Sequence, residues 1–277
     1  MAVQPNEPPK IMNKYHFFEG DLVVNLMPKL TGEGYLLASA ADIIDGRQNA
    51  VQGKPTFNMN FWTGDSVCTD EKGGRLLTLD SLLLRQVTPQ SPLVDGALKL
   101  EEEQWEELKS DKEHSLYLRH AEVEKMQWKG YVLREGKFVP VNKTVAKVWD
   151  FINRGKDLQN YVNFISEVYF YRGLKQGCIM YTCLGDDDKL KSQPSTHLLY
   201  HLELGNVWND MSRVHSGYLD FHNSHLLGSK KVEIPFETSE EVATERLTRR
   251  LVAGGEIRSV LGGNNTGCYT TKPNGGH

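Results

Sequence analysis

The stretch N-K-T-V-A-K-V-W-D-F-I-N-R-G, residues 142–155, carries the clearest structural signal in the chain. Its apolar residues recur with the spacing i, i+3, i+4 and i+7, at Val145, Val148, Trp149 and Ile152. This spacing predicts a helix with one apolar stripe, and that stripe must pack against a core. Asn142 or Thr144 can cap the start of the helix, and Gly155 can end it in the left-handed conformation.

Toward the C-terminus the pattern changes from helix to strand. A second short helix comes first, with four apolar residues on one face: Leu158, Tyr161, Val162 and Ile165. We then expect strands at residues 168–171, 179–184, 197–204, 214–221 and 232–236. A last helix should run from Thr238, which forms a capping box with Glu241, to Val252. Because strands and helices are segregated, the sequence predicts an α+β fold with a mixed, largely antiparallel sheet.

The N-terminal part has weaker patterns. We expect a strand at residues 21–27, ended by Pro28, and a second apolar run at residues 35–38 after a Gly-rich turn. Residues 45–75 are rich in Gly, Asn, Asp and Thr, which indicates a long loop with one short strand. This polar segment holds three aromatic residues: Phe57, Phe61 and Trp62. The leucine-rich segment 76–87 is a buried strand or a helix, and periodicity does not decide between them.

The loop signal T-P-Q-S-P at residues 88–92 indicates a boundary. We therefore expect a β-rich N-terminal part, residues 1–90, and an α+β C-terminal part, residues 91–277, or else one continuous domain. Behind the boundary, an acidic helix surrounds Trp105, and residues 131–141 have the pattern of a hairpin with Glu-Gly at its turn.

Composition limits the class of protein. The 277 residues are 39% hydrophobic and 25% charged, as in ordinary globular chains. No stretch approaches the ~20 apolar residues needed to cross a bilayer, and the first ten residues lack the apolar segment of a secretory signal. The four scattered cysteines predict free thiols and a cytoplasmic protein. The net charge of −4 argues against a dedicated nucleic-acid binder, although it allows a local basic patch.

Histidines are concentrated in one part of the chain. Five of the nine lie between residues 197 and 225: His197, His201, His215, His222 and His225. If 197–204 is a strand, alternation places His197, His201 and Glu203 on the face opposite four apolar residues: Leu198, Tyr200, Leu202 and Leu204.

Two kinds of chemistry fit this histidine cluster. A divalent transition metal would take imidazole and carboxylate ligands, for which the candidates are His197, His201, His222, His225 and Asp220. Alternatively, a histidine could transfer a proton during hydrolysis, and the catalytic candidates are His215, His222 and His225. The competing interpretation is that these residues are surface histidines together with one or two hydrogen-bonded core histidines.

The last fifth of the chain is locally basic. Its candidate nucleic-acid-binding residues are Lys230, Lys231, Arg246, Arg249, Arg250 and Arg258. The Gly-rich segment 254–263 adds backbone amides that could bind an anion, so this region is where RNA or DNA phosphates would bind. An ordinary solvated helix surface is the alternative interpretation.

Together these patterns lead to two hypotheses of function. In the first, the protein is a non-catalytic binding or assembly subunit of a larger intracellular complex. Such a subunit would contact other protein chains and, through its basic C-terminal region, nucleic acid, but no membrane. In the second, it is a histidine-dependent hydrolase with a site in residues 197–225, and only this hypothesis implies a cofactor, a divalent transition metal.

Overall fold

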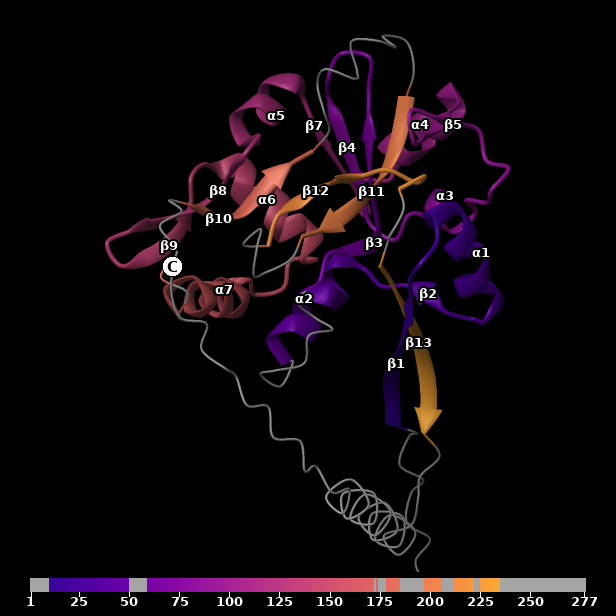
Figure 1. Ribbon diagram of the computed structural model, residues 1–277. Coiled ribbons are helices and arrows are strands. Elements are labelled where there is room, and N and C mark those ends of the chain that lie inside the picture. The colour runs from indigo at the N-terminus through magenta and orange to yellow at the C-terminus, as the bar shows by residue number, and fades with distance from the viewer. Residues whose placement is uncertain are drawn as a thin grey trace, which may run out of the picture. The chain divides into compact units, whose positions relative to one another are not determined.

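The fold is taken from a computed structural model (Figure 1). It describes residues 10–49, 59–171, 173, 178–184, 197–205, 212–221 and 225–234. One compact unit comprises Asn13–Lys230, and it extends across the loop at residues 88–92. A second unit comprises Met1–Met12 and Lys231–His277, of which only residues 10–12 and 231–234 are described. The helix expected from Thr238 to Val252 lies outside the described residues.

Strands and helices are interspersed along the described chain. The strands are β1 (Lys10–Phe18), β2 (Leu36–Leu37), β3 (Phe61–Thr69), β4 (Arg75–Thr78), β5 (Leu93–Val94), β6 (Ala97–Leu100), β7 (Ser115–Leu118), β8 (Lys129–Arg134), β9 (Lys137–Pro140), β10 (Cys178–Cys183), β11 (His197–Leu204), β12 (Val214–Gly217) and β13 (Leu226–Ile234). The helices are α1 (Val23–Gly32), α2 (Ala40–Asn49), α3 (Leu82–Arg85), α4 (Glu102–Ser110), α5 (His120–Met126), α6 (Lys143–Ile152) and α7 (Gln159–Tyr171). None of these helices has the length and apolar character needed to span a membrane.

The strands form a mixed sheet in the order β1-β13-β3-β11-β12-β10-β8-β9, with further strands joined beside this path. β10 pairs with β12 in parallel, and so does β13 with β3, whereas the other pairs with a defined register are antiparallel. The prediction of an α+β fold with a mixed, largely antiparallel sheet is therefore confirmed.

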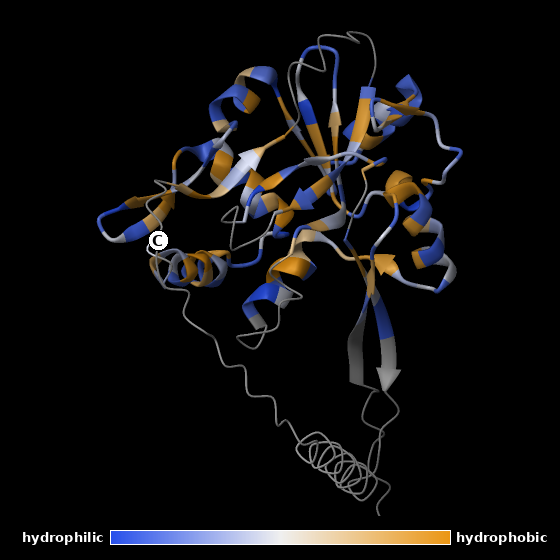
Figure 2. Ribbon diagram, in the orientation of Figure 1, coloured by the Kyte–Doolittle hydropathy of each residue, from blue (hydrophilic) through white to orange (hydrophobic). Residues whose placement is uncertain are grey.

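Both faces of the central strands are buried. Every residue of β3 is buried, and in β11 only His197 is partly exposed. The apolar residues of β11 alternate: Leu198, Tyr200, Leu202 and Leu204 contribute to one hydrophobic cluster, and Leu199 contributes to the other. Helices α2, α5, α6 and α7 pack on the first cluster, and α1, α3 and α4 pack on the second. Hydrophobic segments, orange in Figure 2, accordingly occur in the helices α1, α2 and α7 as well as in the strands.

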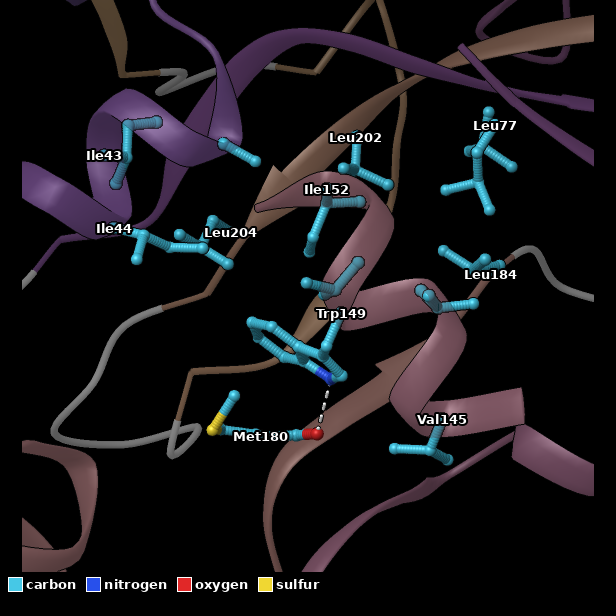
Figure 3. Close-up of a cluster of buried hydrophobic side chains, with 14 of the residues drawn as sticks. Ile43, Ile44, Leu77, Val145, Trp149, Ile152, Met180, Leu184, Leu202 and Leu204 are labelled. Carbon is cyan, nitrogen blue, oxygen red and sulfur yellow. Dashed lines mark hydrogen bonds between the residues drawn. The ribbon is translucent and has the colours of Figure 1, made fainter. Parts of the chain in front are cut away.

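Helix α6 forms as its periodicity predicts. Its four stripe residues are buried, and the Val145 backbone N–H donates to the Asn142 side chain at 3.0 Å, so Asn142 is the N-cap. Arg154 and Gly155 follow the helix with φ values of +57° and +66°, so the left-handed turn that ends it begins one residue before the predicted glycine. Trp149 points into the first cluster, where its Nε1–H donates to the Met180 carbonyl at 2.9 Å (Figure 3).

The strand expected at residues 21–27 is wrong, because this segment belongs to helix α1. Asp21 precedes the helix and accepts hydrogen bonds from the Leu22 N–H at 2.8 Å and the Asn25 side chain at 2.6 Å. The buried residues of α1 follow the helical period: Val23, Val24, Leu26, Met27 and Leu30. Pro28 lies inside the helix rather than ending it.

The long loop expected at residues 45–75 is also wrong. Helix α2 occupies its beginning, and β3 and part of β4 occupy its end. Phe61 and Trp62 are core residues of β3, whereas Phe57 lies outside the described residues. The polar composition was misleading because polar side chains of β3 form hydrogen bonds inside the protein. For example, the Thr63 hydroxyl donates to the Leu202 carbonyl at 2.7 Å.

Other segments differ less from expectation. Residues 76–87 contain both alternatives, since most of β4 is followed by the short helix α3. The strand expected at 168–171 is wrong because α7 continues to Tyr171, so its aromatic residues extend a helix that Tyr161 and Ile165 already anchor in the core. The hairpin is confirmed as β8 and β9, with Glu135 and Gly136 both at positive φ in its two-residue turn.

We predict that Trp149→Ala lowers the free energy of unfolding by about 3–5 kcal/mol, because it leaves a cavity in a packed core. Trp149→Phe keeps most of the ring but leaves the Met180 carbonyl without its donor, so it should cost about 1–3 kcal/mol. Urea unfolding of both variants measures these costs. A small, equal cost for the two substitutions would contradict the packing described above.

Candidate functional site

Three of the five histidines, His197, His201 and His215, lie on one face of β11 and β12. In the antiparallel register, Glu203 is opposite His215, and His201 is opposite Gly217. Directly opposed residues point to the same side of a sheet. The placement of His201 and Glu203 on the face opposite Leu202 is therefore as the sequence predicts, but helices cover this face as well, so it is not open to solvent.

Glu203 and His215 form the closest contact in the cluster. His215 Nε2 lies 3.1 Å from Glu203 Oε1, and its Nδ1 lies 3.2 Å from the Ser216 carbonyl oxygen. Nδ1 thus faces an acceptor, whereas Nε2 lies both near Glu203 and 3.5 Å from an Arg213 guanidinium nitrogen, which can only donate. The other carboxylate oxygen of Glu203 lies over Gly217, where a Cβ would come within 3.2 Å of it. The sheet therefore makes room for this carboxylate by having a glycine opposite.

His201 is a fully buried histidine on the same face. Its ring centroid lies 5.0 Å from that of Trp62, and its Nδ1 lies 3.3 Å from the Thr63 carbonyl oxygen. Because a carbonyl only accepts, Nδ1 carries the proton. Burial lowers the pKa of His201 to about 3, so the ring is neutral at physiological pH. Its Nε2 has no hydrogen-bond partner among the described residues.

The remaining candidates of the cluster lie in separate environments. His197 stacks on Trp105 with ring centroids 4.4 Å apart, and its Nε2 lies 3.1 Å from Glu102. His225 Nε2 lies 3.6 Å from a Glu19 carboxylate oxygen. Asp220 is exposed in the turn after β12, and His222 lies outside the described residues.

In the described part of the chain, no group of three or more His, Cys, Asp or Glu side chains is arranged to hold a metal ion. The structure joins His215 to Glu203, but it gives His197, His201 and His225 different partners. The candidate metal ligands and the candidate catalytic residues both include His222, which lies outside the described residues. Both sets therefore stay predictions.

Only the start of the basic region is described. Lys230 and Lys231 are exposed in β13, and Lys230 Nζ lies 5.7 Å from the centre of the Tyr35 ring. The other candidates lie outside the described residues: Arg246, Arg249, Arg250 and Arg258. A contact of this region with nucleic acid stays a prediction.

Sequence reasoning missed a buried arginine at one end of the central strands. Arg47 of α2 is fully buried, and its guanidinium donates to five groups: the Tyr161 hydroxyl, the Ser212 hydroxyl and the carbonyls of Met59, Leu204 and Gly205. These acceptors lie 2.8–3.3 Å away. The segment was expected to be loop, so the sequence offered no sign of this arginine's position.

A buried carboxylate was missed for the same reason. Asp65 of β3 accepts from the Ala40 N–H at 2.7 Å and from the Asp80 N–H at 3.0 Å, so it holds the start of α2 beside the end of β4. Arg154 lies 3.7 Å away. Burial raises the pKa of Asp65 to about 6 despite these partners.

An apolar groove lies between α7 and the β8–β9 hairpin. Its cavity has a volume of about 300 Å³ and is lined by Gly136, Lys137, Phe138, Val139, Gln159, Val162, Asn163, Ser166 and Phe170. Phe138 on the floor lies 6.0 Å, between ring centroids, from Phe170. Phe170 lines the cavity and is 55% exposed, and two residues adjacent to lining residues are exposed as well. They are Leu133 at 43%, paired with Phe138 in the hairpin, and Tyr171 at 85%, the residue after Phe170 in α7. We call these residues the aromatic groove. Sequence reasoning missed it because it placed residues 168–171 in a strand.

Comparison with known proteins identifies the fold alone. No family model matches the chain, and no curated protein does. A solved structure described as "Accommodation of massive sequence variation in Nanoarchaeota by the C-type lectin fold" is similar, with a TM-score of 0.52 and 13% sequence identity. The similarity covers 80% of this chain and 98% of that one. The architecture is therefore that of the C-type lectin fold.

We predict that His201 makes stability depend on pH. Its folded pKa lies below the unfolded value of 6.5, so the unfolded state binds a proton first as the pH falls, and stability is lost between about pH 6.5 and 3. From pH 7 to pH 5 this loss should be about 2 kcal/mol.

Urea unfolding of wild type and His201→Phe at both pH values isolates this loss, because Asp65 titrates in both proteins and cancels in the difference. His120→Gln, at a half-exposed position, serves as the control. Parallel pH profiles for wild type and His201→Phe would mean that His201 is not held neutral.

Proposed function

We propose that this protein is a non-catalytic binding or assembly subunit that contacts another protein chain through the aromatic groove. The observation that carries the proposal is the exposure of Phe170 in a groove with an apolar floor, together with the exposure of Leu133 and Tyr171, which adjoin its lining residues. Tyr171 is the most exposed of the large apolar residues in the described part of the chain. Aromatic side chains grouped beside a concave apolar surface are typical of protein–protein contacts.

The composition of the groove supports a protein ligand. Val162 and Phe138 supply an apolar floor, and the α7 residues Gln159, Asn163 and Ser166 supply donors and acceptors along one wall. Arg134 and Lys137 are exposed at the tip of the hairpin. A partner with an apolar anchor and acidic residues beside it would complement this surface, because rim charges steer association while buried aromatics supply affinity.

The fold comparison supports a binding function in a general way. The similar structure is described as accommodating massive sequence variation within the C-type lectin fold. A scaffold that tolerates variation can present different surfaces while its core is maintained, which suits recognition. At 13% identity this likeness says nothing about the ligand of the present chain.

The described histidines favour binding over hydrolysis. A general base needs an accessible nitrogen lone pair within reach of its substrate. Both nitrogens of His215 already have protein partners, Glu203 and Arg213 at Nε2 and the Ser216 carbonyl at Nδ1. His201, whose Nε2 is unprotonated, is fully buried. A hydrolase that depends on His222 remains the alternative, and an activity lost in His222→Ala without loss of folding would favour it.

The proposal has two further parts, the cellular compartment and a contact with nucleic acid, and each is supported by fewer observations. The described cysteines Cys68 and Cys178 are free thiols, which supports a reducing compartment such as the cytoplasm. A contact with nucleic acid through the basic C-terminal region would begin at Lys230 and Lys231, which are exposed.

We predict that Phe170→Ser combined with Tyr171→Ser weakens binding of the partner at least about tenfold, which is 1.4 kcal/mol, with little change in melting temperature because both side chains are largely exposed. The partner is first captured on the wild-type protein from cells of its source, then purified and titrated by calorimetry. Leu82→Ser is the matched control, since Leu82 is 65% exposed on α3. Equal affinity of the double variant and wild type would exclude the groove as the interface.

A further inference from the structure

Trp128 combines solvent exposure with an unfavourable backbone conformation. It lies between α5 and β8, its side chain is 62% exposed, and its φ is +56°. Bulky residues rarely adopt this left-handed region, because Cβ approaches the neighbouring carbonyl oxygen. The conformation is held by the Trp128 N–H, which donates to the Thr182 carbonyl at 2.8 Å. Burial of the indole does not explain a tryptophan here, and strain of this kind accompanies functional positions.

Three exposed lysines lie near this tryptophan, either in the chain or in a neighbouring helix. Lys125 and Lys129 are exposed on either side of it in the chain. Lys143 is exposed at the start of α6. The Asn142 side chain, just before it, donates to the Lys125 carbonyl at 2.7 Å, so the first turn of α6 lies beside the last turn of α5. Trp128 and the three lysines therefore belong to neighbouring exposed segments, and we call these four residues the Trp128 patch.

Two described acidic residues lie nearby: Glu122 is ion-paired, whereas Glu124 has only a histidine beside it. Glu122 lies 3.4 Å from Arg119 and 4.0 Å from Lys147, and Glu124 lies 3.5 Å from His120. Among the ion pairs of the described residues, none includes a lysine of the Trp128 patch. The patch is thus locally positive in a chain whose net charge is −4.

We propose that the Trp128 patch binds single-stranded nucleic acid, with a base stacked on the Trp128 indole and phosphates on Lys125, Lys129 and Lys143. An exposed indole with cations around it is the arrangement that single strands use, since each base has a face to stack and each phosphate a charge to neutralise. A duplex keeps its bases stacked internally and offers the indole nothing. This surface is separate from the aromatic groove, so the inference does not rest on the proposed function.

Salt dependence follows from the number of lysines. Three phosphate contacts on a single strand predict a slope of about −2 for log K against log salt, because each contact releases about 0.7 of a counterion. At physiological salt, charges beyond about 8 Å are screened, so the net negative charge of the chain does not prevent contact at the patch.

The test measures the affinity of the full chain for a labelled oligothymidylate of about twenty nucleotides. Fluorescence anisotropy of the oligonucleotide is followed at several salt concentrations. Trp128→Gly should weaken binding about tenfold or more, because one stacked base is lost. Lys129→Gln should reduce the salt slope by about 0.7. Lys72→Gln, at an exposed lysine outside the patch, should change neither quantity.

Thermal unfolding separates this role from a structural one. Glycine accepts a positive φ freely, so Trp128→Gly should melt at the same temperature as wild type or higher while losing affinity. If Trp128→Gly melts lower, Trp128→Asn, which also tolerates this conformation, must reproduce the loss of binding in a stable protein.

Three results would overturn the proposal. The first is no binding at 20 mM salt, and the second is binding that none of the patch substitutions weakens. The third is equal affinity for polyglutamate of the same length, which would show that the patch recognises acidic chains in general and would point to an acidic protein.

Discussion

The burial of β3 and β11 on both faces is the constraint on which the rest of this structure depends. A strand covered on two sides leaves no water for its polar groups, so each must find a partner inside the protein. The Thr63 hydroxyl donates to β11, Asp65 accepts from the start of α2, and Arg47 donates to carbonyls at the end of β11. These contacts fix the position of α2 against the sheet, and they explain why so polar a segment lies in the core.

This constraint also bears on the histidines. Residues that alternate on β11 must point into one cluster or the other, so His201 becomes a neutral core residue beside Trp62. Glu203, only 7% exposed, lies next to His215 and above Gly217. Polar groups used in this way stabilise the fold and are poorly placed to meet a substrate. The two surfaces that we propose for binding, the aromatic groove and the Trp128 patch, are instead exposed.

Strand β10 links the core to the Trp128 patch. Its Met180 carbonyl accepts the Trp149 indole N–H of α6, and its Thr182 carbonyl accepts the backbone N–H of Trp128. Met180 itself has a φ of +53°, so the strand is distorted where it meets both tryptophans. The buried contact of Trp149 and the left-handed backbone of the exposed Trp128 thus share one supporting strand.

Local pattern by itself determined α6, β11 and the β8–β9 hairpin, because each has one apolar face or a turn with its own backbone signature. It also placed His201 and Glu203 on a common face. Local pattern failed to predict α2, β3 and the end of α7. In these elements, burial on two sides or contacts with residues distant in sequence leave no regular alternation of apolar and polar residues. The tertiary structure decided which partners the histidines have, since Thr63 and Glu102 lie far from them in sequence. It also decided that Tyr171 and Trp128 stay exposed, because no local pattern shows which apolar side chains a fold leaves uncovered.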